Sequence, residues 1–300
     1  MLNKSFSLHV SKKIKPYNKI IKVDSDKSIS IRSFLIGAIS HNVSKVKNVL
    51  ESDDVFSCIN CLRKLGVKIK KIKDGQYLIY GKGLGSLYAK KNMVLNCGNS
   101  GTTARLLIGL LSTNPNIQIR IKGDNSLNKR SMKKLFDSMS EFGATFLPKN
   151  KNNFPISLIS SEIPIGTEYK TGVSAQLKSA TILAGLNSYG VTNIIEKKQS
   201  RNHTENMLLQ TPNIIKIKKN NKGHGHIKVF GKNYLDPLKI DVGGDPSSAA
   251  FFTALTLLAP RSRLKINHVG LNQRRIGFYN ILKKHGAKMK FRNIKKKNHE

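Results

Sequence analysis

Lysine, serine and arginine stand together in residues 26–32 (DKSISIR), ahead of an apolar stretch. The apolar stretch predicts a helix, and these residues would open it. A helix start offers unpaired backbone N–H groups and a partial positive charge, to which Lys27 and Arg32 would add charge-assisted donors. The pattern favours binding of a phosphate or a carboxylate. Two solvated basic residues at a helix start would look the same, so this motif alone does not decide.

Two more segments combine turn residues with a helix start. Residues 96–105 (NCGNSGTTAR) form a Gly-rich turn before an apolar helix, which lets the backbone approach an anion closely. No Lys follows the second Gly, so this is not a P-loop, and the dinucleotide fingerprint does not match either. Residues 123–130 (GDNSLNKR) place Arg130 before an amphipathic helix, where a guanidinium can bind phosphate through two N–H groups. A plain strand-to-helix turn and a solvated arginine are the alternatives.

Residues 174–179 (SAQLKS) and 200–205 (SRNHTE) stand at equivalent places further along the chain. Asn202 and Glu205 have the spacing of a capping box, which is the structural alternative for the second segment. His203 is a weaker candidate for a general base, because its context is that of a cap. Cys58 and Cys61 have the CxxC spacing of a zinc or redox site. No second Cys pair or well-spaced His accompanies them and they lie in a helical pattern, so core packing is favoured.

The chain contains an internal repeat that positions these motifs. Apolar helices rich in small residues are predicted to end near residues 40, 112, 188 and 259. Amphipathic helices are predicted to stop at Gly66, Gly143, Pro212 and Gly286. Glycine can adopt positive φ at a helix end without steric cost, and proline at position 212 also stops a helix. Each repeat therefore predicts a strand, a buried helix, a strand, a surface helix and a further strand. Folding should gather the anion-binding candidates at one end of the packed units.

Composition bounds the function without defining it. The 300 residues include 53 Lys plus Arg against 17 Asp plus Glu, a formal net charge of +36. The basic residues are scattered along the chain and there is no Trp. A surface enriched in lysine through biased amino-acid composition, together with a phosphate-binding pocket, is therefore favoured over nucleic-acid binding.

The longest nearly apolar run, residues 249–259, is shorter than the roughly 20 residues that a bilayer requires. Three cysteines and no signal-peptide pattern predict a cytoplasmic protein.

Six ordered motifs together resemble the 5-enolpyruvylshikimate-3-phosphate synthase family. They are residues 26–30 (DKSIS), 95–103 (LNCGNSGTT), 123–127 (GDNSL), 174–180 (SAQLKSA), 200–205 (SRNHTE) and 245–252 (DPSSAAFF). The resemblance implies an α/β fold of two domains, each an inside-out α/β barrel of three repeated units. On this basis residues 23–240 are expected to form a complete substrate-binding domain. Residues 1–22 and 241–300 would form part of a second, truncated domain.

The resemblance also implies an activity and the residues that perform it. The enolpyruvyl group of phosphoenolpyruvate would pass to the 5-hydroxyl of shikimate 3-phosphate with release of phosphate, without metal or cofactor. Lys27 would be catalytic and would touch both substrates. The residues implied for shikimate 3-phosphate are Lys27, Ser28, Arg32, Ser174, Ala175, Gln176, Ser200 and Arg201. Those implied for phosphoenolpyruvate are Lys27, Asn99, Gly101, Arg130 and Gln176.

In the family, the catalytic Asp and Glu lie further toward the C-terminus than the position that corresponds to residue 300 of this chain. Turnover is therefore expected to need a complementing C-terminal polypeptide, whereas a complete chain would be a monomer. One rival is the sister transferase that acts on UDP-N-acetylglucosamine, against which the 27–30 and 200–205 motifs speak. The other is a non-catalytic basic protein that binds nucleic acid. A membrane is not expected to take part under any of these hypotheses.

Overall fold

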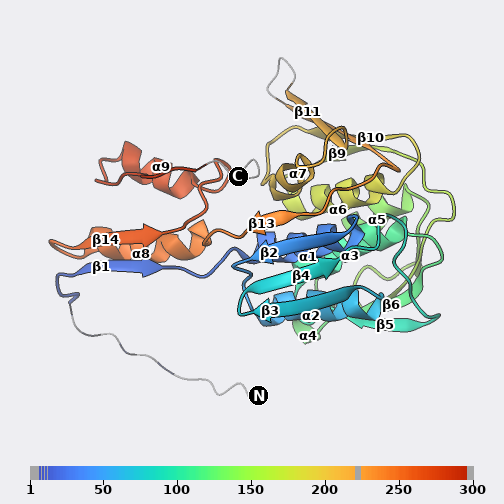
Figure 1. The fold of residues 1–300 in the computed structure, drawn as a ribbon, viewed down its shortest axis with the longest axis horizontal. Helices are drawn as coiled ribbons and strands as arrows, with labels where there is room; N and C mark the ends of the chain where they lie inside the picture. Colours follow the sequence, from blue (N-terminus) through green and yellow to red (C-terminus); the bar gives the residue numbers. More distant parts are fainter. Residues whose placement is uncertain (1–6, 8, 10, 12, 220–223, 296–300) are drawn as a thin grey trace.

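A computed structural model describes residues 7, 9, 11, 13–219 and 224–295 of the chain. The described residues form a larger lobe and a smaller lobe, which lie side by side (Figure 1). Each lobe has its own cluster of buried apolar side chains. The larger cluster runs from Ile29 to Val242, and the smaller one is built around Val23, Ala249, Ile276 and Tyr279.

The larger lobe contains three four-stranded sheets with one shared topology. The first is β13 (Lys239–Asp241), β2 (Val43–Lys47), β4 (Gln76–Tyr80) and β3 (Lys68–Lys73). The second is β5 (Met93–Asn96), β6 (Gln118–Lys122), β8 (Ile156–Ile159) and β7 (Thr145–Leu147). The third is β9 (Glu168–Thr171), β10 (Val191–Glu196), β12 (Gly225–Phe230) and β11 (Ile215–Lys219). In each sheet the first two strands are parallel and the other pairs are antiparallel.

Three helices lie inside the sheets and are almost wholly buried. They are α1 (Lys27–Ile39), α3 (Gly101–Ser112) and α6 (Ala175–Leu186). Helices α3 and α6 pack closely, because a Cβ at Gly109 would overlap the backbone of Ala180. The outer helices are α2 (Asp53–Lys64), α4 (Asn125–Asn128) and α5 (Lys133–Ser140). Helix α7 (His203–Leu208) is buried at every residue, so the surface helix predicted for the third repeat is wrong. The predicted inside-out α/β arrangement of repeated units is confirmed for the larger lobe.

The smaller lobe repeats the beginning of the same unit. Strand β1 (Asn18–Lys22) pairs in parallel with β14 (Arg263–Asn267), beside α8 (Pro246–Leu258) and α9 (Gly277–Lys284). The repeat predicts that α8 is buried like α1, α3 and α6, and this is wrong for the described residues.

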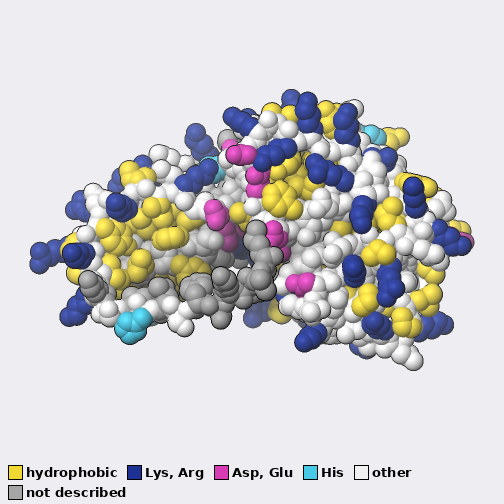
Figure 2. Space-filling view, turned by 90° about the horizontal axis from the view of Figure 1, so that it is seen from below, with side chains coloured by type: hydrophobic (Ala, Val, Ile, Leu, Met, Phe, Trp, Pro, Cys, Tyr) yellow, Lys and Arg dark blue, Asp and Glu magenta, His cyan; other side chains and the backbone are white. Residues whose placement is uncertain are grey.

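Only Pro246 and Ala249 of α8 are buried, while the side chains of Phe251 and Leu258 are 79% and 80% exposed. Among the described residues, the two-stranded sheet covers one side of α8 and no further sheet closes over it. Figure 2 shows hydrophobic side chains gathered on this lobe. In the described part of the chain, no helix is both long enough and apolar enough to cross a membrane.

Candidate functional site

The first turns of the three inner helices meet at one end of the larger lobe. Asp26, Ser100 and Ser174 cap α1, α3 and α6, each accepting a hydrogen bond from a backbone N–H in the first turn. Gln176 in α6 accepts from Arg105 Nη1 at 2.8 Å and donates to Thr102 Oγ1 at 2.9 Å, both on α3. Three helix starts with unpaired N–H groups therefore surround one region, which favours anionic ligands.

Arg32 joins α1 to this region from a buried position, with 3% of its surface exposed. Its Nε donates to Thr204 Oγ1 at 2.8 Å and its Nη2 to Ser179 Oγ at 3.0 Å. Its Nη1 donates to the carbonyl of Ser28 at 3.1 Å. Burial lowers the pKa of Arg32 to about 10, so the guanidinium is still charged at neutral pH.

A second group of side chains lies around the start of α3. Arg130 Nη2 donates to Asn99 Oδ1 at 2.7 Å. A Cβ on Gly101 would lie 2.8 Å from Arg105 Nη1 and 3.2 Å from Arg130 Nη1, so both guanidinium groups lie against this glycine. Burial and the charge of Arg130 lower the pKa of Arg105. Two like charges held this close favour an anion between them.

Lys27, at the first position of α1, reaches the start of α2. Its Nζ lies 2.5 Å from Asp54 Oδ2, and 49% of its side chain is exposed. The carboxylate orients the ammonium while leaving two of its three N–H donors unused by Asp54. Asp54 lies 27 residues from Lys27 in the sequence, and no motif in the chain predicts this pair.

Five of the predicted residues line one cavity of about 460 Å³. The cavity is bounded by Val173, Ser174, Ala175, Gln176, Gln199, Ser200, Arg201 and Arg274. Lys27, Ser28 and Arg32 do not line it, although Arg32 reaches the neighbouring Ser179. A second cavity, of about 540 Å³, lies beside Lys129 and Ser131 and contains none of the predicted residues.

A buried charged network supports the floor of this cavity. Lys178 is fully buried, and its Nζ lies 2.8 Å from Glu196 Oε1 and 2.7 Å from Glu205 Oε1. Glu196 Oε1 also accepts from the backbone N–H and the hydroxyl of Ser200, both at 2.6 Å. Burial would raise the pKa of Glu196, but the hydrogen bonds from Lys178 and Ser200 outweigh it and lower that pKa.

The capping box that is the structural alternative for residues 202–205 does not form. Asn202 is the N-cap of α7 but makes no side-chain cap hydrogen bond; its Nδ2 donates to Asn206 Oδ1 at 3.0 Å. Glu205 is buried and pairs with Lys178, because a carboxylate in the core needs a charged partner, and Lys178 serves Glu196 and Glu205 together. His203 is also buried, and its Nε2 lies 3.2 Å from Arg275 Nη1.

The comparisons with known proteins agree with this arrangement. The family described as EPSP synthase (3-phosphoshikimate 1-carboxyvinyltransferase) has a model that matches residues 11–300. The chain belongs to the EPSP synthase family. Its fold is that of EPSP synthase from Acinetobacter baumannii, with a TM-score of 0.81 and 34% identity. That likeness covers 91% of this chain and 60% of that one.

Curated relatives give the same family assignment. The 3-phosphoshikimate 1-carboxyvinyltransferase of Zymomonas mobilis is 39% identical over 285 residues, which are 95% of this chain and 62% of the relative. That of Bacillus cytotoxicus is 40% identical over 275 residues, or 91% of this chain and 63% of the relative. The chain thus spans somewhat less than two thirds of these EPSP synthases.

Gly101 gives a first test of the anion site of this EPSP synthase family member. Gly101→Ala is expected to weaken binding of inorganic phosphate roughly tenfold, because the new methyl group displaces Arg105 and Arg130. Stability should change by less than about 1 kcal/mol, since the displaced atoms end flexible side chains. Gly277→Ala is the matched control: it also opens a helix, yet nothing lies within 4 Å of the added carbon. Calorimetric titration measures both variants, and equal affinities for the two would contradict the geometry.

Arg275 joins the two lobes of the family fold at their helix starts. Its Nη1 donates to Asp26 Oδ2 at 2.6 Å, and its Nη2 donates to Asp245 Oδ1 at 2.5 Å. Asp26 caps α1 of the larger lobe, and Asp245 caps α8 of the smaller lobe. Burial would raise the pKa of Asp26, but the charges of His203 and Arg275 outweigh it and lower that pKa. The ion pairs of Arg275 with Asp26 and Asp245 therefore stabilise the fold while Asp26 is ionised.

Arg275→Gln is expected to reduce the free energy of unfolding by about 1.5–3 kcal/mol at pH 7. The lowered pKa of Asp26 contributes stability above its ordinary value of 3.8, and that stability is lost as the pH falls through the folded-state pKa. The difference between wild type and variant should therefore shrink below about pH 4. Urea unfolding at pH 7, 5 and 3 measures it. A difference of the same size at pH 3 would show that the ion pair is not its source.

Proposed function

We propose that the chain binds shikimate 3-phosphate and phosphoenolpyruvate where its inner helices begin. The enolpyruvyl group would pass to the 5-hydroxyl of shikimate 3-phosphate, with release of phosphate. The observation that carries this proposal is the cavity that brings Ser174 and Gln176 at the start of α6 together with Ser200 just before α7, within the third repeat. Its hydroxyl groups and the Arg201 guanidinium suit the phosphate of shikimate 3-phosphate.

Phosphoenolpyruvate would lie at the start of α3. Arg130 would bind its phosphate, with Asn99 orienting the guanidinium and Gly101 giving the ligand room. Gln176 bridges the two regions, since it contacts α3 and lines the cavity on α6. Lys27 would contribute positive charge to both substrates.

The chemistry asks mainly for two anions to be held together in reacting geometry. Fixing both reactants removes much of the entropic barrier, and preorganised cations stabilise charge that develops in the tetrahedral intermediate. A proton must also reach the methylene carbon of phosphoenolpyruvate and another must leave the 5-hydroxyl, which requires general acid–base groups. We propose that a complementing C-terminal polypeptide supplies those groups.

We assign residues 23–240 to a complete substrate-binding domain, and residues 1–22 with 241–300 to part of a second one. Two separate apolar clusters support this division, although Val23 packs in the smaller cluster and Val242 in the larger one. The exposed apolar face of α8 would be covered by the complementing polypeptide. Cytoplasmic location would suit a pathway of small phosphorylated substrates.

The two rivals have less support. Residues 27–30 and 200–205 follow the shikimate type, and residues 200 and 201 of the second segment line the cavity, which disfavours UDP-N-acetylglucosamine as acceptor. A nucleic-acid-binding face would gather basic side chains in a band. On the face drawn in Figure 2, Lys and Arg are instead spread over both lobes.

Phosphate release from shikimate 3-phosphate and phosphoenolpyruvate tests the proposal. The purified chain is to be assayed alone and with a polypeptide made of the part of the Zymomonas mobilis relative that it does not match. Release is expected only when both are present. Turnover by the chain alone would remove the need for a complementing polypeptide. No release in either assay, with no binding of shikimate 3-phosphate, would contradict the function itself.

A further inference from the structure

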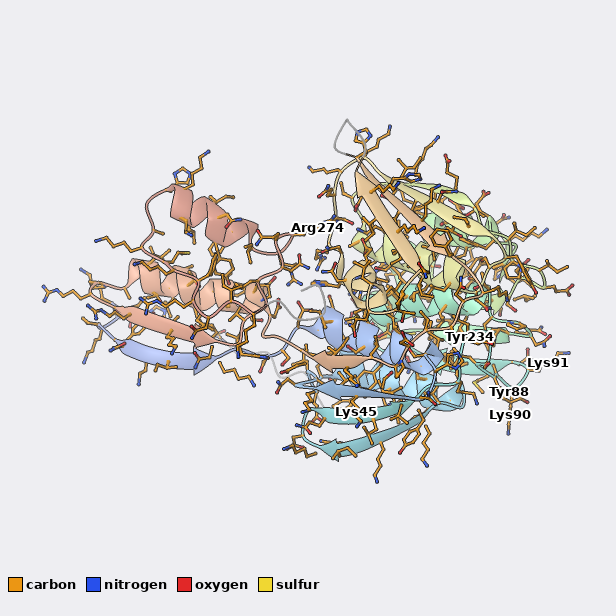
Figure 3. All side chains as sticks on the ribbon, turned by 45° about the horizontal axis from the view of Figure 1, so that its top comes forward. Lys45, Tyr88, Lys90, Lys91, Tyr234 and Arg274 are labelled. Carbon is orange, nitrogen blue, oxygen red and sulfur yellow. The ribbon has the colours of Figure 1, made fainter. Side chains whose placement is uncertain are left out.

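Arg274 belongs to the smaller lobe, but its side chain lines the 460 Å³ cavity whose other lining residues belong to the larger lobe. It stands in the connection between β14 and α9, where Figure 3 shows it on the side that faces the larger lobe. Its side chain is 22% exposed and lines the cavity together with Ser174, Ser200 and Arg201. None of the six motifs includes it.

Half of the guanidinium is used to hold the Ser200 turn. Arg274 Nη1 donates to the Ser200 carbonyl at 2.6 Å and lies 3.4 Å from Glu196 Oε2. For Nε and Nη2 there is no hydrogen-bond partner among the residues that the structure describes. An Arg side chain presents Nε–H and one Nη2–H in parallel, which is the edge that binds two oxygens of a phosphate or carboxylate.

The charge balance of the cavity also favours an anion beside Arg274. Glu196 is already paired with Lys178 at 2.8 Å, so it neutralises Arg274 only in part. The described lining contains two arginines, Arg201 and Arg274, and no Asp or Glu. The hydroxyl of Ser174 lies at the start of α6, whose N–H groups add further donors.

We infer that Arg274 binds the phosphate of shikimate 3-phosphate through Nε and Nη2, so that the substrate site is completed by the smaller lobe. This inference rests on the proposed function. It makes the cavity a composite site: Ser174, Ser200 and Arg201 come from the larger lobe, and Arg274 comes from the smaller one. Because Arg275 next to it joins the lobes through Asp26 and Asp245, the position of Arg274 is fixed by the same connection.

Calorimetric titration with shikimate 3-phosphate and with shikimate tests the inference on the full chain. Arg274→Gln is expected to weaken binding of shikimate 3-phosphate about 10- to 100-fold, the effect of losing charge-assisted hydrogen bonds, and to leave shikimate unchanged. Arg274→Lys should lie in between, because it keeps the charge but not the paired donors. Arg292→Gln, an exposed arginine of the same lobe, should match wild type.

The outcomes separate this inference from the function on which it rests. If wild type binds neither ligand, the proposed function is contradicted. If wild type binds shikimate 3-phosphate and Arg274→Gln binds it equally well, the role of Arg274 is contradicted while the function stands. Equal losses for both ligands would also overturn it, because Arg274 would then act only by holding the Ser200 turn. Thermal unfolding of each variant shows whether the fold is retained, and Arg274→Lys provides the readout if Arg274→Gln unfolds.

Discussion

Lys178→Met is expected to reduce the free energy of unfolding by about 3–5 kcal/mol. The change leaves Glu196 and Glu205, each 1% exposed, in the core without the ammonium that pairs with both. Folded domains have total stabilities of about 5–15 kcal/mol, so this loss is a large fraction of the total and should shift the unfolding midpoint to a much lower urea concentration. Urea unfolding followed by circular dichroism gives the value.

Two further variants control this prediction. Lys170→Met removes an exposed lysine that lies 3.6 Å from Glu168, and it should leave stability nearly unchanged, because surface pairs contribute little. Lys178→Met combined with Glu205→Gln should recover part of the loss, since one of the two stranded charges is removed. A double variant no more stable than Lys178→Met would contradict the assignment of the loss to buried charge.

Lys27→Met is expected to weaken binding of shikimate 3-phosphate and of phosphoenolpyruvate by about 10- to 100-fold each. The ammonium is the group at the start of α1 that the proposed site shares between the two substrates, and methionine keeps much of its length without the charge. Stability should change little, because the Lys27–Asp54 pair is substantially exposed. Titration calorimetry with each substrate measures the effect.

Lys45→Met is the matched control for Lys27. Lys45 is an exposed lysine of β2, and Figure 3 shows it on the outer sheet, away from Arg274 and the helix starts. Its substitution should leave both affinities unchanged. Equal losses for Lys45→Met and Lys27→Met would mean that overall positive charge, rather than Lys27 itself, attracts the substrates.

The repeat and the residues that end its helices could be predicted from the sequence because they depend on local chemistry. Gly66, Gly143 and Gly286 stop their helices with φ of +84°, +91° and +84°, a conformation that glycine adopts without strain. The small-residue helices in the first three repeats are buried as predicted. The fourth prediction failed at α8, since burial depends on which elements cover a helix and not on its own sequence.

The site was predictable only in part, because much of it consists of contacts between distant residues. The motifs supplied the helix starts and the cavity residues. They did not show that Glu205 turns inward to Lys178, or that Asp54 holds Lys27 across 27 positions. Arg275 meets Asp26 across 249 positions, and no local pattern encodes such a pair. The one signal that could have suggested Arg105 is its place one helical turn after Gly101.

Acceptor binding tests the central claim most directly. The wild-type chain is to be titrated in a calorimeter with shikimate 3-phosphate and, separately, with UDP-N-acetylglucosamine, each at 0.15 M salt so that nonspecific attraction is screened. We predict saturable 1:1 binding of shikimate 3-phosphate and no saturable binding of the sugar nucleotide. Saturable binding of UDP-N-acetylglucosamine, or no binding of shikimate 3-phosphate, would contradict the account.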